Sequence, residues 1–224
     1  MRYLLFTLLL LSQNGLAQST LDITVDPVRF QVDATNRLIL CQTDLAPYAE
    51  IGDSTQVQLL VGNALYPITE KQVGLTYQSS YAVQREEGTY QLFFTQLPII
   101  AIATNFAIVD EPKVLASFQY IDEEQEITSS IGIEVRGGFS QTFPKKTFDL
   151  EFWEDDSGEN TRDVQFGTMR EDDDWILDAL YNEPIRVRSL MAHNTWVKMH
   201  QPTYQAEEPE AESGADVTWV EVFV

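Results

Sequence analysis

The stretch Ile131-Gly-Ile-Glu-Val-Arg-Gly-Gly-Phe-Ser140, followed closely by Phe143-Pro-Lys-Lys-Thr-Phe-Asp-Leu150, holds the clearest pattern in the chain. Apolar and polar residues alternate in both halves, which is the period of a half-buried β-strand. Residues 137–144 lie between the halves and are rich in turn formers. The sequence therefore predicts two antiparallel strands joined by a longish loop.

Two lysines, Lys145 and Lys146, open the second of these strands. Alternation places Lys146 on the same face as the apolar residues and Lys145 with the polar ones. An ammonium on an apolar face is costly unless it meets a carboxylate or a ligand anion, so we expect Lys146 to pair with Glu183 or Asp178. A simpler interpretation is that Lys146 lies at the end of the sheet and reaches water. A glycine-rich bend beside a lysine is also a plausible way to hold phosphates.

The N-terminus has the pattern of a secretory signal peptide over residues 1–17. A basic start precedes the apolar run 4–11, and small residues at Gly15 and Ala17 suit cleavage after Ala17. This run is too short to span a bilayer comfortably, and no later run is apolar enough to do so. We expect a secreted or otherwise extracytoplasmic protein that is soluble once the signal is removed.

The chain is strongly acidic, with 14 Lys and Arg against 35 Asp and Glu and a net charge of −21. Such a surface repels nucleic acids and anionic membranes and favours cations and basic polypeptides as partners. The single cysteine, Cys41, excludes an intrachain disulfide and is expected to be a small apolar strand residue. Hydrophobic residues make up 44% of the chain, enough for a globular core.

Residues 20–96 are predicted to form a β-sandwich-like domain. Strand-like runs at 21–25, 28–32, 37–41, 56–61, 81–84 and 89–94 are separated by turn residues, without helical periodicity. No motif in this region carries chemistry. Its tyrosines are candidates for a sugar-binding face, but scattered tyrosines in a sandwich are more often packing residues. They are Tyr48, Tyr66, Tyr77, Tyr81 and Tyr90.

Residues 97–224 are predicted to be a mixed α+β unit on an antiparallel sheet, with one principal helix at 183–200. Asn182 is its expected cap, and a stripe formed by Val187, Leu190, Met191 and Val197 should pack on the sheet. Cations are unfavourable at a helix start, which suggests for Arg186 and Arg188 an anionic partner such as Asp178, Asp174 or a phosphate, or else an ordinary surface ion pair.

Two other acidic or apolar segments of this unit call for an interpretation. Residues 172–174 are three consecutive aspartates, but they lack the pattern of a calcium-binding loop and are interpreted as a solvated turn. The final run, 217–224, has the pattern of a strand. Because domains seldom end on such a strand without a further neighbour, we expect the chain to be a fragment.

From about residue 97 to 224 the chain resembles the N-terminal portion of the CotH kinase domain, a family of secreted, spore-coat-type atypical protein kinases. The motifs that carry the resemblance agree in order as well as in kind. They are Leu97-Pro98, Arg136-Gly137 with Ser140, Phe143-Pro-Lys-Lys146, Asp174-Trp175 with Leu177, Tyr181 with Asn182-Glu-Pro184, Arg188, and Val220-Glu-Val-Phe-Val224.

This resemblance implies a kinase-like N-lobe and transfer of a phosphoryl group from ATP to a secreted protein, with Mg or Mn bound by acidic residues. It also implies which residues lie near the nucleotide, and these are Arg136, Gly137, Gly138, Ser140, Lys145, Lys146, Glu183 and Arg188. In the family Arg188 belongs to an arginine–asparagine pair, whose asparagine is Ser189 here.

The catalytic and metal-binding aspartates of such kinases lie further along than this chain reaches, so we expect these 224 residues alone to be inactive. They are also expected to bind nucleotide weakly at most. The alternative hypothesis is a non-enzymatic extracellular β-rich module that binds glycan or protein.

Overall fold

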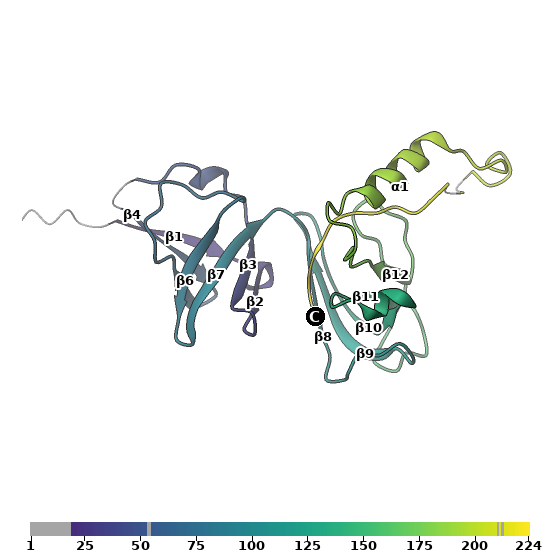
Figure 1. The fold of residues 1–224 in the computed structure, drawn as a ribbon, viewed down its shortest axis with the longest axis horizontal. Helices are drawn as coiled ribbons and strands as arrows, with labels where there is room; N and C mark the ends of the chain where they lie inside the picture. The colour runs from purple at the N-terminus through teal and green to yellow at the C-terminus, as the bar shows by residue number, and fades with distance from the viewer. Residues whose placement is uncertain (1–18, 53–54, 210, 212) are drawn as a thin grey trace, which may run out of the picture. The chain divides into compact units, whose positions relative to one another are not determined.

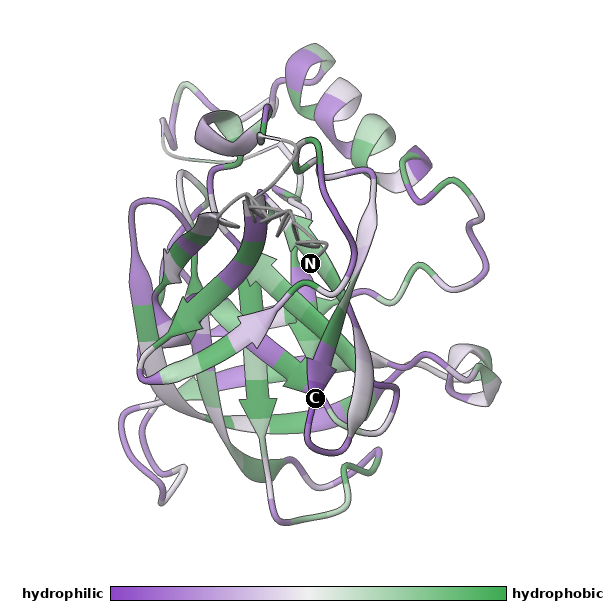
Figure 2. Ribbon diagram, turned by 90° about the vertical axis from the view of Figure 1, so that its left-hand side faces the viewer, coloured by the Kyte–Doolittle hydropathy of each residue, from purple (hydrophilic) through white to green (hydrophobic). Residues whose placement is uncertain are grey.

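The computed structural model describes residues 19–52, 55–209, 211 and 213–224, so the expected signal peptide at 1–17 lies outside the described residues. The chain divides into two compact units, and the boundary in the sequence lies between Thr95 and Gln96 (Figure 1). Hydrophobic residues are concentrated along the strands, and the connecting loops are mostly hydrophilic (Figure 2). Each unit therefore has a β-rich core of its own.

The first unit contains a three-stranded and a four-stranded sheet. The strands of the smaller sheet, in spatial order, are β1 (Ser19–Val25), β4 (Thr55–Val61) and β5 (Ala64–Pro67). Those of the larger sheet are β2 (Phe30–Asp33), β3 (Leu38–Gln42), β7 (Gly88–Thr95) and β6 (Ser80–Arg85). Short 3-10 turns, η1 (Pro27–Arg29) and η2 (Ala46–Tyr48), connect them. The pairs β1–β4 and β3–β7 are parallel, and the others are antiparallel.

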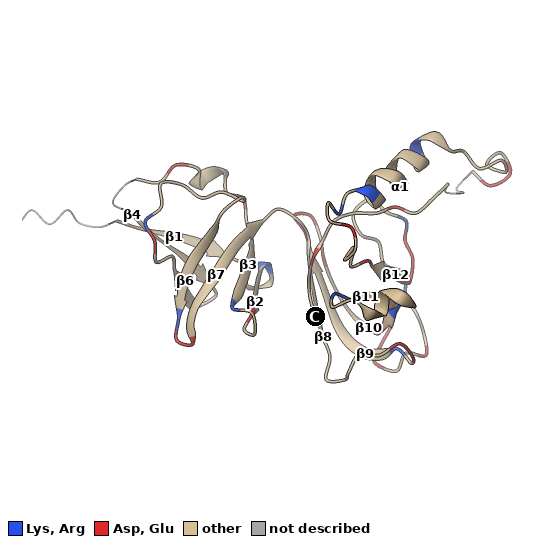
Figure 3. Cartoon of the chain, viewed as in Figure 1, with Lys and Arg blue, Asp and Glu red and all other residues tan. Residues whose placement is uncertain are grey.

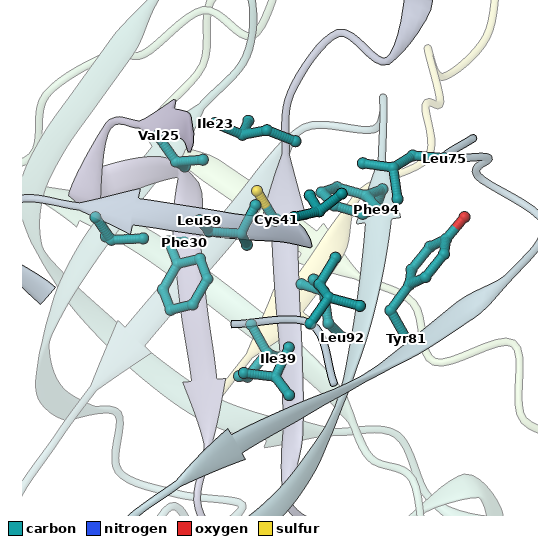
Figure 4. Close-up of a cluster of buried hydrophobic side chains, with 14 of the residues drawn as sticks. Ile23, Val25, Phe30, Ile39, Cys41, Leu59, Leu75, Tyr81, Leu92 and Phe94 are labelled. Carbon is teal, nitrogen blue, oxygen red and sulfur yellow. The ribbon is translucent and has the colours of Figure 1, made fainter. Parts of the chain in front are cut away.

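Both sheets contribute buried side chains to one core (Figure 4). Ile23 and Leu59 come from the smaller sheet, and Cys41 and Leu92 from the larger one. Burial raises the pKa of the Cys41 thiol to about 12, so this side chain is a neutral core group, as predicted. The tyrosines of this unit are packing residues, since Tyr81 and Tyr90 are buried and Tyr48, Tyr66 and Tyr77 pack against the same core.

The second unit is built on a six-stranded sheet. Its strands, in spatial order, are β12 (Asp174–Leu177), β11 (Thr147–Trp153), β10 (Glu126–Arg136), β9 (Val114–Ile121), β8 (Ile99–Ala103) and β13 (Glu221–Phe223). All neighbours are antiparallel except β13 and β8. The predicted pair is confirmed as β10 and β11, with Ile133 opposite Leu150. The prediction of a mainly β protein is thus confirmed.

One face of this sheet holds the core of the second unit. Ile131, Ile133, Leu150 and Phe152 are buried there, because alternation puts them all on that face. The ring of Phe118 meets Phe152 edge-on, with centroids 4.8 Å apart. Side chains from the segment before β12, such as Phe166, complete the cluster. The residues between these positions form a polar face.

The principal helix, α1 (Arg188–Met199), begins five residues later than predicted and ends one residue earlier. The residues before it form turns, since Leu180 and Arg186 have φ of 45° and 55° and Glu183 N donates to Leu180 O. Asn182 therefore does not cap the helix. The predicted packing on the sheet is also wrong, because no residue of α1 is buried. Within the described residues, α1 and the other helical segments are too short or too polar to cross a membrane.

Candidate functional site

The bend, residues 137–146, connects β10 to β11 and contains five of the eight residues expected near a nucleotide. Gly137 has a φ of 103°, and a Cβ there would collide with Ser140 Oγ, so the turn requires glycine. A Cβ at Gly138 would meet no atom within 4 Å. The 3-10 turn η3 (Phe139–Thr142) follows, and Phe143 N closes it by donating to Ser140 O.

Lys146 fixes the end of this bend. Its ammonium donates to Gln141 O at 2.6 Å and to Phe143 O at 2.7 Å. The predicted pairing with Glu183 or Asp178 is therefore wrong, because main-chain carbonyls take the place of a carboxylate. A half-buried ammonium needs acceptors, and the free carbonyls of a short 3-10 turn supply them without a second charge.

Lys145 is exposed, and charged groups of both signs act on it. Partial burial and the neighbouring Arg186 lower the pKa of its ammonium, whereas the carboxylates of Glu221 and Asp178 act in the opposite direction. Two cations that repel each other at one place are an environment in which a bound anion is stabilising. Lys145 and Arg186 are thus the residues of the site best suited to meet an anion.

The facing segment, residues 178–186, lies against the bend. Thr147 Oγ1, at the start of β11, is 3.4 Å from Asp178 Oδ1 and accepts a hydrogen bond from Ala179 N. The rings of Phe143 and Tyr181 are 5.1 Å apart, and Phe139 meets Phe143 edge-on at 5.4 Å. Two segments 30 to 40 positions apart in the sequence therefore form one surface.

Glu183 and Arg188 contact each other at the start of α1. The Glu183 carboxylate accepts from Arg188 N at 3.1 and 3.2 Å, and Arg188 Nε lies 3.9 Å from Glu183 Oε1. Glu183 thereby satisfies a main-chain donor of the first helical turn. Of the partners considered for Arg188, neither Asp174 nor Asp178 takes that role. The contact with Glu183 is the surface ion pair of the simpler interpretation.

Arg136 points to a second charged cluster, on the polar face of the sheet. Its Nη1 donates to Asp149 Oδ2 at 2.7 Å. Lys113 lies 3.6 Å from Asp149, 3.8 Å from Glu151 and 3.6 Å from Asp174. Sequence reasoning missed this cluster. The signal was the alternation that places Glu134, Asp149 and Glu151 on one face, but the neighbouring strands were needed to add Lys113 and Asp174.

This cluster raises the pKa of several of its members, for different reasons. Burial disfavours the charged form of Lys113, but Glu151, Asp149 and Asp174 outweigh it and raise the pKa of the ammonium. Burial is the largest cause that raises the pKa of Glu134 and of Asp174; the charge of Lys113 acts against it, and the neighbouring carboxylates add to it. The cluster is a salt-bridge network with more carboxylates than cations.

Within 19–52, 55–209, 211 and 213–224, no three or more His, Cys, Asp or Glu side chains are grouped so that they could hold a metal ion.

Residues 133–209 match the family model of the CotH kinase protein. The matched segment begins in β10 and includes the bend, both lysines, β11, β12, the facing segment and α1. The resemblance to this family is therefore confirmed for this part of the chain. Neither the curated proteins nor the solved structures include a match to the chain.

Proposed function

We propose that this chain is part of a secreted CotH-type protein kinase and that its bend binds the phosphates of a nucleotide. The observation that carries the proposal is the family match over residues 133–209, which contains the whole surface formed by the bend and the facing segment. In phosphoryl transfer, a substrate hydroxyl oxygen forms a bond to the terminal phosphorus of the nucleotide and gives up its proton, while the bond from that phosphorus to its bridging oxygen breaks and the nucleoside diphosphate leaves. An extracellular protein, favoured to be basic by the chain's net charge of −21, is the proposed acceptor.

We assign the phosphate contact to Lys145 and a positioning role to Lys146. The ammonium of Lys146 already donates to Gln141 O and Phe143 O, and it keeps the bend in shape. Lys145 is exposed, and Arg186 beside it contributes to lowering its pKa. A triphosphate between these two cations would replace their mutual repulsion by attraction.

The first prediction tests this assignment by titrating the chain with a fluorescent ATP analogue. Lys145→Ala should weaken binding by roughly tenfold, because it removes a direct charge–charge contact with phosphate. Lys71→Ala, at an exposed lysine of the first unit, is the matched control and should leave affinity unchanged. Lys146→Ala should loosen the bend, which a lower unfolding temperature would report together with weaker binding.

Two results would contradict the proposal. Unchanged affinity of Lys145→Ala would remove Lys145 from the site. If the unmodified chain failed to bind the analogue at all, the phosphate-binding role of the bend would be refuted. Radiolabelled transfer to a basic protein, measured on the same preparations, tests the expectation that these 224 residues alone transfer no phosphate.

The second candidate function is an extracellular module that binds glycan or protein. The observation that favours it is the row of aromatic rings on the bend and facing segment, where Phe139 is 79% and Tyr181 46% exposed. Exposed aromatic rings are typical of binding surfaces. Failure to bind nucleotide, together with retention on a glycan or protein matrix that Phe139→Ala abolishes, would favour this function.

A further inference from the structure

Helix α1 presents an apolar face to solvent. Met191, Trp196 and Met199 are 64%, 52% and 80% exposed. With Ala192, Thr195 and His200 they line an open hollow of about 490 Å³. We call these residues the apolar face of α1. Contiguous exposed apolar surface of this kind is typical of a binding site rather than of an ordinary solvated helix.

The apolar face combines one fixed ring with adaptable side chains. Trp196 stacks on His200, with ring centroids 4.4 Å apart and planes 13° from parallel, and its Nε1 donates to Ser213 O. Met191 and Met199 lie on either side, and methionine side chains adapt to partners of different shape. A rigid aromatic anchor flanked by methionines suits the apolar side of a helical peptide.

An acidic loop adjoins the C-terminal end of this face. Residues 201–216 follow α1, and their Asp216 lines a second hollow together with His200, which also lines the first. The chain from 201 to 224 has no Lys or Arg. Its acidic residues are Glu207, Glu208, Glu210, Glu212, Asp216 and Glu221. Figure 3 shows acidic residues along the loop after α1 and basic residues on the helix itself, which are Arg188 at its start and Lys198 in its last turn.

We propose that the apolar face of α1 docks a basic amphipathic helical segment of a partner protein, with the basic end of that segment near Glu207, Glu208 and Asp216. Charge complementarity carries the choice of occupant, since apolar side chains meet the face while lysines or arginines meet the carboxylates. A second copy of this chain would bring the same acidic loop to the interface, and like charges would oppose pairing. An anionic lipid surface is disfavoured for the same reason. The proposal stands independently of nucleotide binding.

The test measures the anisotropy of a dye-labelled peptide titrated with the whole chain. The probe has leucines at i, i+3, i+4 and i+7 and lysines on its flanks, and it is compared with the same peptide carrying glutamates instead. We expect the lysine peptide to bind at least roughly tenfold more tightly, and added salt to reduce the difference. A peptide of the same composition with scrambled leucine spacing should bind poorly, because it presents no apolar stripe.

The double variant Met191→Ser, Met199→Ser should weaken binding of the lysine peptide by roughly tenfold. Both side chains are exposed, so the unfolding temperature should not change. Val73→Ser, at a 72% exposed valine of the first unit, is the matched control and should bind as the unmodified chain does. Equal binding of the scrambled peptide would reduce the effect to general charge attraction and overturn the proposal. A dimer in sedimentation that the double variant abolishes would also overturn it, by showing that a second copy covers the face.

Discussion

At the scale of single residues, Lys113 stabilises a group of neighbouring carboxylates on the polar face of the six-stranded sheet. The register places Glu134 opposite Asp149 and Glu151 opposite Asp174, so carboxylates face each other across three strands. Like charges at such positions are destabilising. The ammonium of Lys113, with a side chain 21% exposed, lies within 4 Å of three of the four. Together with Arg136, which donates to Asp149, it offsets the repulsion among these carboxylates.

Lys113→Met should therefore destabilise the second unit by about 1–3 kcal/mol, the cost of leaving partly buried polar groups without their partner. Urea unfolding at pH 7 measures the change, and Lys71→Met at an exposed site is the matched control. The deficit should shrink in acid, where the carboxylates become protonated. A variant as stable as the unmodified chain would indicate that water, rather than Lys113, solvates these carboxylates.

Some residues of the candidate site could be predicted from the sequence because their role depends on neighbouring positions in the chain. The bend and its lysines are adjacent in sequence, so Gly137, Lys145 and Lys146 could be singled out from composition and alternation. The partner of Lys146 could not, because its acceptors are carbonyls exposed by the 3-10 turn η3, which the sequence did not predict. The charge of Arg186 acts on Lys145, and the sequence did not predict this because residues 180–186, with positive φ at Leu180 and Arg186, form turns rather than the expected helix start.

At the scale of elements, Gly132 of β10 and Trp153 of β11 pack closely against each other. Trp153 lies across Gly132, where a Cβ would collide with the indole, and a Cβ at Gly158 would lie 3.1 Å from the same ring. The indole Nε1 donates to Glu151 Oε2 at 2.7 Å, which fixes the orientation of the ring. Glycine in a strand interior normally weakens it, so its presence here reflects the close approach of the ring.

Gly132→Ala should destabilise the protein by about 1–3 kcal/mol, because the overpacking against Trp153 exceeds the gain of about 0.5–1 kcal/mol from replacing glycine in a strand. Urea unfolding gives the free energy, and near-ultraviolet circular dichroism reports displacement of the indole. In a Trp153→Phe background the same substitution should cost less, since the colliding ring atoms are gone. An equal cost in both backgrounds would assign the effect to the backbone instead.

The elements differ in how well the sequence predicted them. The strand patterns predicted β3 and β7 to within one residue at each end, because one face of each strand is buried, whereas β10 begins at Glu126, five residues before the predicted strand. β5 and β12 have four residues each and were missed, since so short a run shows little alternation. The helix pattern predicted that α1 exists. Its apolar stripe also predicted burial, but Met191 and Val197 are exposed.

At the scale of the whole molecule, excess negative charge governs the response to pH. The net charge of −21 at pH 7 makes the folded chain repel itself. Two kinds of carboxyl group respond differently as the pH falls. The pKa of Glu134 and of Asp174 is raised, first by burial, whereas hydrogen bonds lower the pKa of Asp33, Asp155 and Asp172.

These shifts predict a stability maximum on the acidic side of neutrality. A carboxyl whose folded pKa is raised binds its proton first in the folded state, so stability increases as the pH falls from 7 toward the ordinary values of 4.5 for Glu134 and 3.8 for Asp174. A carboxyl with a lowered pKa contributes stability above its ordinary value of 3.8, and that contribution is lost as the pH falls below it.

The unfolding temperature should thus rise, pass through a maximum and then fall as acid is added. Asp174→Asn should flatten the rising part, because it removes one of the two groups responsible, while Asp163→Asn, at an exposed aspartate outside this cluster, is the matched control. A steady decline in unfolding temperature from pH 7 downward would show that the hydrogen-bonded aspartates, rather than the crowded carboxylates around Lys113, dominate the proton balance.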